Sequence, residues 1–272
     1  MAQKVKDELK TEVETLKQSG KNTCLAVIIV GEDPASKVYV KGKIKDCAEI
    51  GIESREFALP ETATQEELLS LVNQLNTDSS VSGILVQLPL PKHLDDKDII
   101  NSIDPRKDVD AFHPSNVGKI MIGDYDFLPC TPAGVMEILK EYNIDIAGKE
   151  CVVVGRSNIV GKPQIMLLLQ QHGTVTVCHS KTRDLAEVTR RADILVVAIG
   201  RGEFITGDMI KPGAVVIDVG MNRNAEGKLV GDVHFPSAEQ VASHITPVPG
   251  GVGVMTRAIL MKNTVKAAKM GL

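Results

Sequence analysis

A tyrosine and a lysine early in the chain are spaced so that they could do proton chemistry together. Asp33 and the proline after it are typical of a helix start. On such a helix Ser36, Tyr39 and Lys43 fall three and four residues apart, so they share one stripe. That stripe borders an apolar one, which would place Lys43 at the edge of the core, beside an aromatic hydroxyl. Partial loss of water suits a lysine to proton transfer, although a lysine that only covers apolar surface with its stem is the alternative.

A glutamine follows the apolar run Gly83–Val86. Gln87 ends this run, and two prolines stand close behind it in QLPLP. A polar side chain at the carboxyl end of a parallel strand faces the crevice in which α/β proteins bind ligands; Gln87 could equally cap loop backbone. The next segment, DPRKDVDAFHP, has three aspartates but not the spacing and final glutamate of a calcium loop. We therefore interpret it as an acidic surface turn, with a structural or solvated His113 and no metal.

The stretch VVVGRSNIVGKP, residues 152–163, has the form of a strand that turns into a helix at a phosphate-binding loop. Gly155 would allow the tight turn and Gly161 the close packing of the helix. Arg156 and Ser157 would add a charge and a hydroxyl donor. The fingerprint G-x-G-x-x-G is not matched, because Ser157 replaces its second glycine and Gly161 comes one residue late. A tight turn with no ligand is the alternative.

The residues at the next strand tip indicate which dinucleotide this loop would hold. NAD sites usually have an acidic residue about 20 positions on, where it accepts from the ribose 2′-hydroxyl. Here the chain reads VTVCHSKTRD, in which Ser180, Lys181 and Arg183 follow the strand and no acid stands at its tip. The nearest acid, Asp184, is expected to belong to the next helix. A hydroxyl and two cations suit a 2′-phosphate, so the sequence favours NADP over NAD.

Apolar runs alternate with helical patterns along most of the chain, which predicts an α/β fold with parallel sheets covered on both faces. One series extends to about Cys130, the other from about Gly148 to Asn222, and a helix over Thr131–Tyr142 joins them. Two domains also fit a length of 272 residues. The expected strands are Leu25–Val30, Ser54–Ala58, Gly83–Gln87, Cys151–Val154, Val175–Cys178, Ile194–Ile199 and Val215–Val219.

Composition excludes several classes of function. The formal net charge of −4 argues against nucleic acid or an anionic membrane as the main partner. Apolar runs are far shorter than the roughly 20 residues of a membrane span, and the charged N-terminal segment does not resemble a secretory signal. The five cysteines are scattered without a C-x-x-C pair, which suits a reduced, cytoplasmic compartment. The six histidines have no ligand spacing, so we expect no metal site.

Nine motifs occur in one order along the chain: SKVYVKGK, VQLPLP, KDVDAFHPSN, PCTPAG, VVVGRSNIVGKP, CHSKT, DVGMN, GDV and ITPVPGGVG. Together they closely resemble the methylenetetrahydrofolate dehydrogenase/cyclohydrolase family of the FolD type, over nearly the whole chain. The resemblance implies oxidation of 5,10-methylenetetrahydrofolate with NADP, then hydrolysis of the methenyl form to 10-formyltetrahydrofolate. These reactions belong to one-carbon metabolism and support purine biosynthesis.

The resemblance also implies an architecture. A folate-binding catalytic domain would consist of residues 1–130 with 255–272, and a Rossmann-type NADP-binding domain of residues 131–254. Tetrahydrofolate derivatives would bind in a cleft between these two α/β domains, and the protein would be a homodimer.

Residue roles come from the resemblance as well. Lys43 would be central to proton transfer in the cyclohydrolase step, Tyr39 would pack beside the folate, and Gln87 would hydrogen-bond Lys43 and tune its charge. Asp110 would hold the pterin ring, which completes the predicted catalytic set. The predicted substrate-binding residues are Tyr39, Lys43, Val86, Gln87, Leu88, Asp110, Pro249, Gly250, Gly251 and Gly253. The predicted cofactor-binding residues are Gly155, Arg156, Ser157, Gly161, Ser180, Lys181 and Met221.

The chain departs from the family pattern at a few positions. Ala111 replaces the usual glycine after KDVD, Val254 the usual proline after PGGVG, and Gly202 a frequent proline. The usual short strand and D-G-K turn do not precede the first helix, so the resemblance does not establish the edge of the N-terminal sheet. None of these changes removes a chemical group, so we expect activity. The alternatives are an enzyme with only one of the activities, a dehydrogenase of the shikimate type, and a nucleotide sensor without catalysis.

Overall fold

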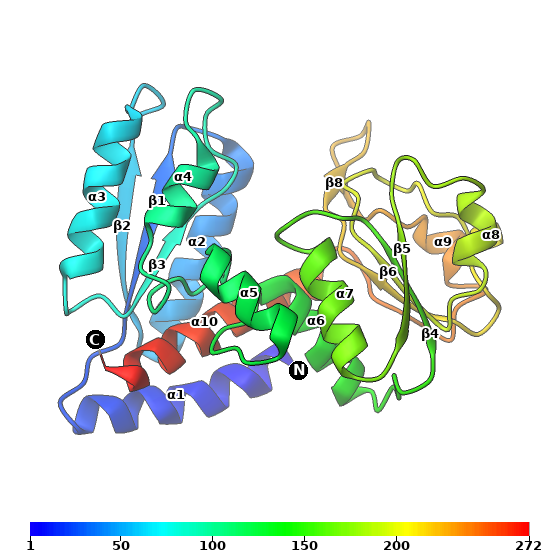
Figure 1. Ribbon diagram of the computed structural model, residues 1–272, viewed down its shortest axis with the longest axis horizontal. Helices are drawn as coiled ribbons and strands as arrows, with labels where there is room; N and C mark the ends of the chain where they lie inside the picture. Colours follow the sequence, from blue (N-terminus) through cyan, green and yellow to red (C-terminus); the bar gives the residue numbers. More distant parts are fainter. Residues whose placement is uncertain (272) are drawn as a thin grey trace. The chain divides into compact units, whose positions relative to one another are not determined.

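The computed structural model describes residues 1–271, which form two compact α/β units (Figure 1). Unit 1 contains residues 1–119, 125–128 and 257–271, and unit 2 contains residues 120–124 and 129–256. The first helix, α1 (Ala2–Gln18), lies in unit 1 beside residues 257–270 of the last helix, α10 (Val252–Met270). An ion pair between Lys269 and Glu12 links them. Unit 1 is therefore closed by segments from both ends of the chain.

The core of unit 1 is a three-stranded parallel sheet in the order β2-β1-β3. Every residue of the central strand β1 (Cys24–Val30) and of β3 (Gly83–Val86) is buried. The prediction of strands covered on both faces is correct for these two. It is wrong for β2 (Glu53–Leu59), an edge strand whose residues are exposed or half-buried.

Helices pack on both sides of this sheet. Side chains of α3 (Gln65–Thr77) and α4 (Asp96–Ser102) share one apolar core with alternate residues of β1. On α2 (Pro34–Ile50), residues contact β1, β2 and α1. The next helix is α5 (Pro114–Ile122), of which residues 114–119 belong to unit 1 and residues 120–122 to unit 2.

Helix starts in unit 1 follow local signals in the sequence. The Asp33 carboxylate accepts from the Ser36 N–H at 2.7 Å, and Pro34 occupies the first helical position of α2. Thr64 and Glu67 form the predicted capping box at the start of α3. Because α2 begins where expected, the position of every side chain along it follows from the helical repeat.

Unit 2 is built on a five-stranded parallel sheet in the order β10-β7-β6-β4-β5. Its strands are β4 (Glu150–Val154), β5 (Thr174–Cys178), β6 (Ile194–Val197), β7 (Val215–Asp218) and β10 (His244–Ile245). The chain passes from β4 outward to β5 and then returns to β6 on the other side of β4. Such a reversal of strand order opens a crevice at the carboxyl ends of β4 and β6, where doubly wound folds bind their ligands.

Short elements complete unit 2. Its helices are α6 (Cys130–Glu141), α7 (Gly161–Gln170), α8 (Leu185–Thr189), α9 (Phe235–Ala238) and the 3-10 turn η1 (Gly207–Met209). The pair β8 (Asn222–Arg223) and β9 (Leu229–Val230) forms an antiparallel ribbon. The sequence did not predict β8, β9 or β10, because two residues are too few to show an alternating pattern.

The loop over residues 104–111 of unit 1 is anchored in the core, so its interpretation as a surface turn is wrong. Lys107 is only 2% exposed, and its Nζ donates to the carbonyls of Leu75 and Asp78 at 3.0 and 2.7 Å. A cation at these carbonyls stabilises the C-terminal end of α3. Desolvation lowers the pKa of Lys107, against the opposing charges of Asp78 and Asp104.

The next residue is buried as well. The Asp108 carboxylate accepts from the His113 N–H and from Nδ2 of Asn116, both at 2.8 Å. Burial raises the pKa of Asp108, and these donors oppose that shift. On α10, Nδ2 of Asn263 donates to the Val109 carbonyl at 2.8 Å. The loop that leads to Asp110 is therefore fixed by several buried polar contacts.

Ala111 ends this loop with a backbone that usually requires glycine. Its φ angle is 57°, in the left-handed region, and its side chain is fully buried. This conformation explains why the family pattern has glycine at the position. Any residue with a Cβ is strained in this conformation by about 1–2 kcal/mol relative to glycine, and alanine is the smallest such residue.

Substitution of Ala111 tests this account of the loop. We expect Ala111→Val to lower the free energy of unfolding by about 2–4 kcal/mol, because a β-branched side chain adds crowding to the strain. Ala111→Gly should change it by less than about 1 kcal/mol, since relief of strain offsets the lost methyl group. Equilibrium unfolding in urea measures both. A valine variant as stable as the parent protein would contradict the account.

Candidate active site

Lys43 and Gln87 meet in unit 1, where β3 ends. Lys43 Nζ donates to Gln87 Oε1 at 3.0 Å. The Gln87 amide nitrogen donates to the Leu88 carbonyl at 2.6 Å, and since a carbonyl only accepts, this contact fixes which side-chain atom faces the lysine. The Gln87 backbone N–H continues the ladder to the Ile28 carbonyl at 2.8 Å. The structure thus contains the hydrogen bond that the resemblance implied, and it holds Lys43 against a neutral partner.

Tyr39 lies one turn before Lys43 on α2 and is half-buried. Burial raises the pKa of Tyr39, and the charge of Arg257 opposes that rise. The neighbouring Lys41 and Lys45 are exposed, as the helical stripe predicted. Tyr39 and Lys43 therefore share a partly buried stripe that is distinct from the solvated lysines of the same helix.

A partly buried ion pair ties α2 to α10, and sequence reasoning missed it. Arg257 Nε lies 3.0 Å from Asp46 Oδ2, and Lys6 Nζ lies 3.4 Å from the other carboxylate oxygen. Gly42 leaves room for this arginine, because a Cβ there would lie 2.3 Å from its Nη1. The partners are up to 211 residues apart, so no local pattern could reveal the pair.

Asp110 is half-buried and directly follows the anchored part of its loop. Val109 packs against Gly83, where a Cβ would lie 2.5 Å from the valine Cγ1. The Ile84 N–H donates to the Lys107 carbonyl at 2.7 Å, so the loop runs beside β3. Unit 1 thus contains all four predicted catalytic residues, with Val86 and Leu88 flanking Gln87.

The predicted cofactor loop joins β4 to α7 in unit 2. Gly155 has a φ of 135°, and a Cβ there would lie 2.2 Å from the Ala198 carbonyl oxygen. A Cβ on Gly161 would lie 2.5 Å from the Gly155 carbonyl oxygen. Both positions therefore require glycine for close backbone approach. Ser157 Oγ accepts from the N–H groups of Val160 and Gly161 at 3.2 Å each, which caps the start of α7.

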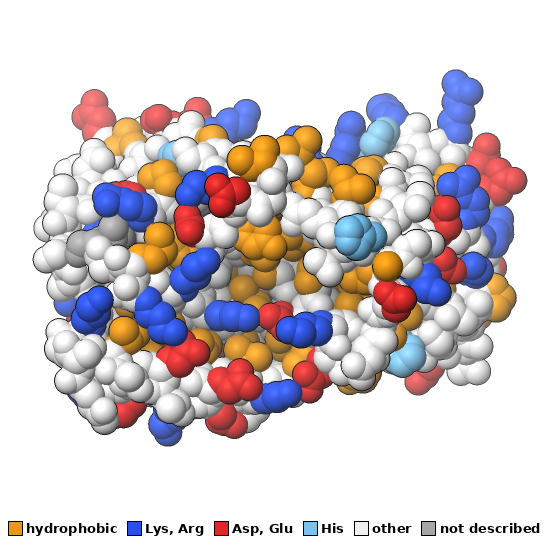
Figure 2. All heavy atoms as spheres, turned by 60° about the horizontal axis from the view of Figure 1, so that its bottom comes forward, with side chains coloured by type: hydrophobic (Ala, Val, Ile, Leu, Met, Phe, Trp, Pro, Cys, Tyr) orange, Lys and Arg blue, Asp and Glu red, His pale blue; other side chains and the backbone are white. Residues whose placement is uncertain are grey.

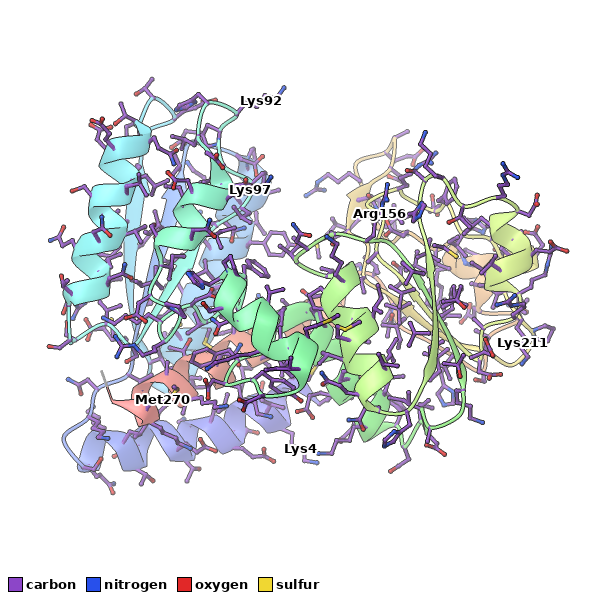
Figure 3. The ribbon with its side chains drawn as sticks, viewed as in Figure 1. Lys4, Lys92, Lys97, Arg156, Lys211 and Met270 are labelled. Carbon is purple, nitrogen blue, oxygen red and sulfur yellow. The ribbon has the colours of Figure 1, made fainter. Side chains whose placement is uncertain are left out.

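The donors of this loop fit a phosphate. Within residues 1–271, the N–H groups of Arg156, Ser157 and Asn158 have no hydrogen-bond partner, and all three residues are exposed. Because Ser157 Oγ only accepts inside the loop, its own O–H remains able to donate. Figure 3 shows Arg156 at this end of unit 2 and Lys211 at the other. A dinucleotide held here would have its pyrophosphate at the start of α7.

The strand tip after β5 lies next to this loop, because β5 pairs with β4. Its turn is closed by bonds from the Thr182 N–H to the His179 carbonyl and from the Lys181 N–H to the His179 ring, at 2.8 and 3.1 Å. The turn leaves Ser180 and Lys181 exposed. Asp184 stands at the N-cap of α8, so it belongs to the next helix as predicted.

The remaining predicted residues also lie in unit 2. A Cβ on Gly253 would lie 3.4 Å from Cε of Met221, so the structure brings these two together. Gly250 has a φ of 104°, and a Cβ on Gly251 would lie 2.4 Å from the Pro247 carbonyl oxygen. Glycine is thus required at both of these positions.

Two buried carboxylates near these loops were missed, although the motifs DVGMN and GDV contain them. Asp218 is 3% exposed and Asp232 is fully buried. Burial raises the pKa of Asp218 to about 6, against backbone N–H donors that lower it. The sequence does show a glycine near each aspartate, Gly220 and Gly231. Only the structure shows that each glycine makes room for the carboxylate of the other motif.

Surface charge, potential metal ligands and apolar helices are the features that other kinds of ligand would need. On the face shown in Figure 2, basic and acidic side chains are intermixed. No group of three or more potential metal ligands gathers among residues 1–271. No helix in the part of the chain that the structure describes is long and apolar enough to cross a membrane.

Comparisons with known proteins show which family the chain belongs to. The sequence profile of the tetrahydrofolate dehydrogenase/cyclohydrolase catalytic domain matches residues 1–110, and that of the family's NAD(P)-binding domain matches residues 129–272. The chain is 70% identical over 270 residues to the bifunctional protein FolD of Acetivibrio thermocellus, covering 99% of this chain and 95% of that protein.

Solved structures show the same likeness. The crystal structure of the bifunctional enzyme FolD from Campylobacter jejuni has a TM-score of 0.97 at 53% identity, covering 100% of this chain and 96% of that one. The Trypanosoma brucei FolD structure, complexed with NADP cofactor and an inhibitor, has a TM-score of 0.95 at 40% identity, covering 99% and 95%. The protein therefore belongs to the tetrahydrofolate dehydrogenase/cyclohydrolase family and is a bifunctional enzyme of that family.

Proposed function

We propose that the protein oxidises 5,10-methylenetetrahydrofolate to the methenyl form with NADP and then hydrolyses it to 10-formyltetrahydrofolate. The observation that carries this proposal is the Lys43–Gln87 hydrogen bond beside Tyr39, in the part of the chain that matches the family's catalytic domain. Unit 1 would be the folate-binding domain and unit 2 the NADP-binding domain.

The dehydrogenase step depends mainly on holding the substrate. Tyr39 would pack beside the folate and Asp110 would bind its pterin ring. A hydride leaves the methylene carbon as its C–H bond breaks, and the product is the methenyl cation. NADP supplies the acceptor for that hydride when it is bound. No proton has to be removed in this step, so orientation and exclusion of water are the contributions of the protein.

The cyclohydrolase step needs a group that moves protons. Water adds to the methenyl carbon and loses one proton, which leaves a neutral hydroxyl adduct. The hydroxyl then loses its proton to form the formyl C=O as the bond from that carbon to N5 breaks and N5 gains a proton. The formyl group remains on N10, and one proton is released overall. We assign the proton transfers to Lys43, because its partner Gln87 is neutral and does not lock the lysine in its charged form.

The preference for NADP over NAD is assigned to the tip of β5. Ser180 and Lys181 are exposed there, beside the end of β4, with Arg183 close behind. The T. brucei relative was solved with NADP. These side chains would donate to the 2′-phosphate, and no carboxylate stands at the tip to accept from a ribose hydroxyl.

We also propose a homodimer in the cytoplasm that supplies one-carbon units for purine biosynthesis. All five cysteines are buried free thiols, which suits a reducing compartment. The dimer rests on the family resemblance, and light scattering coupled to size-exclusion chromatography tests it.

Replacement of Lys43 by methionine tests the assignment of the proton transfers. We expect Lys43→Met to slow the hydrolysis of 5,10-methenyltetrahydrofolate by at least about 10²-fold, because general acid–base catalysis is lost. NADP reduction should continue, since the hydride step needs no lysine. Lys41→Met, at an exposed position of the same helix, is the matched control and should keep both rates. A Lys43→Met enzyme that still hydrolyses at the parent rate would refute the assignment.

Acidic residues at the β5 tip test the cofactor preference. We expect the double variant Ser180→Asp, Lys181→Glu to shift the ratio of kcat/KM for NADP to that for NAD by at least about tenfold toward NAD. Repulsion of the 2′-phosphate is the physical reason. Lys149→Glu, an exposed site before the start of β4, controls for reversing the charge of a surface lysine. An unchanged ratio in the double variant would contradict the 2′-phosphate site.

A further inference from the structure

The buried carboxylate of Asp232 in unit 2 accepts hydrogen bonds from consecutive backbone N–H groups of the loop after β6. Asp232 Oδ2 accepts from the N–H groups of Ile199 and Gly200 at 2.7 and 3.0 Å. Its Oδ1 accepts from the Arg201 N–H at 2.8 Å and from Nδ2 of Asn222 at 2.9 Å. Three consecutive N–H groups that converge on one anion form a backbone nest. Such nests often bind ligand phosphates, but here the protein's own carboxylate fills the nest.

This nest lies at the crevice where the strand order reverses. The loop Ala198–Arg201 directly follows β6, which pairs with β4. A Cβ on Gly155 would lie 2.2 Å from the Ala198 carbonyl oxygen, so this loop touches the first residue of the cofactor loop. The nest therefore holds a loop that packs directly against the start of the cofactor loop.

Asp218, at the end of β7, holds Asp232 in turn. Its Oδ1 accepts from the N–H groups of Gly220 and Asp232, and its Oδ2 from that of Val233, all at 2.9 Å. A Cβ on Gly231 would lie 1.8 Å from Asp218 Oδ2, and one on Gly220 would lie 2.2 Å from Asp232 Cγ. The Asp218 carboxylate thus packs against Gly231, next to Asp232, and the Asp232 carboxylate packs against Gly220, close to Asp218. The two aspartates therefore hold each other in place.

The same carboxylate also fixes Met221. This residue stands between Gly220, which packs on Asp232, and Asn222, which donates to it. Its methyl group in turn reaches Gly253. Asp232 therefore holds two neighbouring parts of the crevice, the loop after β6 and the residue that the family pattern sets against the cofactor.

Strand order indicates which half of a dinucleotide these parts would meet. The β5 tip, with the proposed 2′-phosphate contacts, lies on one side of β4, and β6 and β7 lie on the other. A dinucleotide with its pyrophosphate at α7 would place its nicotinamide half along β6 and β7. We propose that Asp232 is a positioning residue for this half: its carboxylate holds the loop after β6 and Met221 in the conformation that receives the nicotinamide. This inference rests on the proposed NADP-dependent function.

Asp232→Asn is the variant of choice, because it keeps the shape and removes one acceptor. Whichever way its amide turns, an NH₂ group faces two of the four donors. We expect the Kd for NADP, measured by titration calorimetry without folate, to rise at least about tenfold. The amides of residues 199–201 should exchange hydrogen faster in the cofactor-free protein. Hydrolysis of methenyltetrahydrofolate, which needs no cofactor, should stay within about threefold of the parent rate.

Asp193→Asn is the matched control. Asp193 lies at the amino end of the sheet, just before β6. It accepts from the Glu150 N–H at 2.9 Å and from Lys211 at 2.6 Å. This variant should leave the Kd for NADP and the exchange of residues 199–201 unchanged. An equal effect of the two variants would show a general loss of stability and overturn the proposal.

Other outcomes are equally decisive. The proposal is wrong when Asp232→Asn binds NADP as the parent protein does, or when binding and hydrolysis fall together. If that variant does not fold, Asn222→Ala decides, since it removes a single donor beside Met221; an unchanged Kd then overturns the proposal. A parent protein that does not bind NADP would instead sink the proposed function, so the two failures are distinguishable.

Discussion

The hydrogen bond between Lys43 and Gln87 depends on the parallel arrangement of β1 and β3. Both strands end at the same edge of the sheet, and α2 begins just beyond that edge. Lys43 lies about 13 Å along α2 from its first residue, at 1.5 Å per residue. Side chains on a helix lean toward its N-terminus, so the long lysine reaches back toward the end of β3. An antiparallel β3 would place Gln87 at the opposite edge.

Two charged residues of α2, Asp46 and Lys43, have different kinds of partner. Asp46 is buried and paired with Arg257 and Lys6, so its charge is compensated and its role is to hold helices together. Lys43 instead donates to the neutral amide of Gln87. A neutral acceptor orients the ammonium group without favouring the charged form as strongly as a carboxylate would. This difference suits one residue to packing and the other to proton transfer.

Local signals made much of the fold predictable, and contacts between distant residues account for most of what was missed. Asp33, Pro34, Thr64 and Glu67 determine helix starts through neighbours in sequence, and the strand cores are continuous apolar runs. In contrast, Lys107 was read as part of a surface turn because its partners Leu75 and Asp78 lie about thirty residues away. Asp232 depends in the same way on residues 199–201. For the site, the motif of Tyr39 and Lys43 was visible, whereas the anchors of its loops were not.

The central claim is that one chain couples oxidation and hydrolysis of a folate-bound carbon. It is tested most directly by supplying the purified protein with 5,10-methylenetetrahydrofolate and NADP while following three species. These are reduced nicotinamide, the methenyl intermediate and 10-formyltetrahydrofolate. The account predicts that reduced nicotinamide and 10-formyltetrahydrofolate form in equal amounts, with only transient methenyl. Absence of reduction, or methenyl that disappears no faster than it does without protein, would contradict the account.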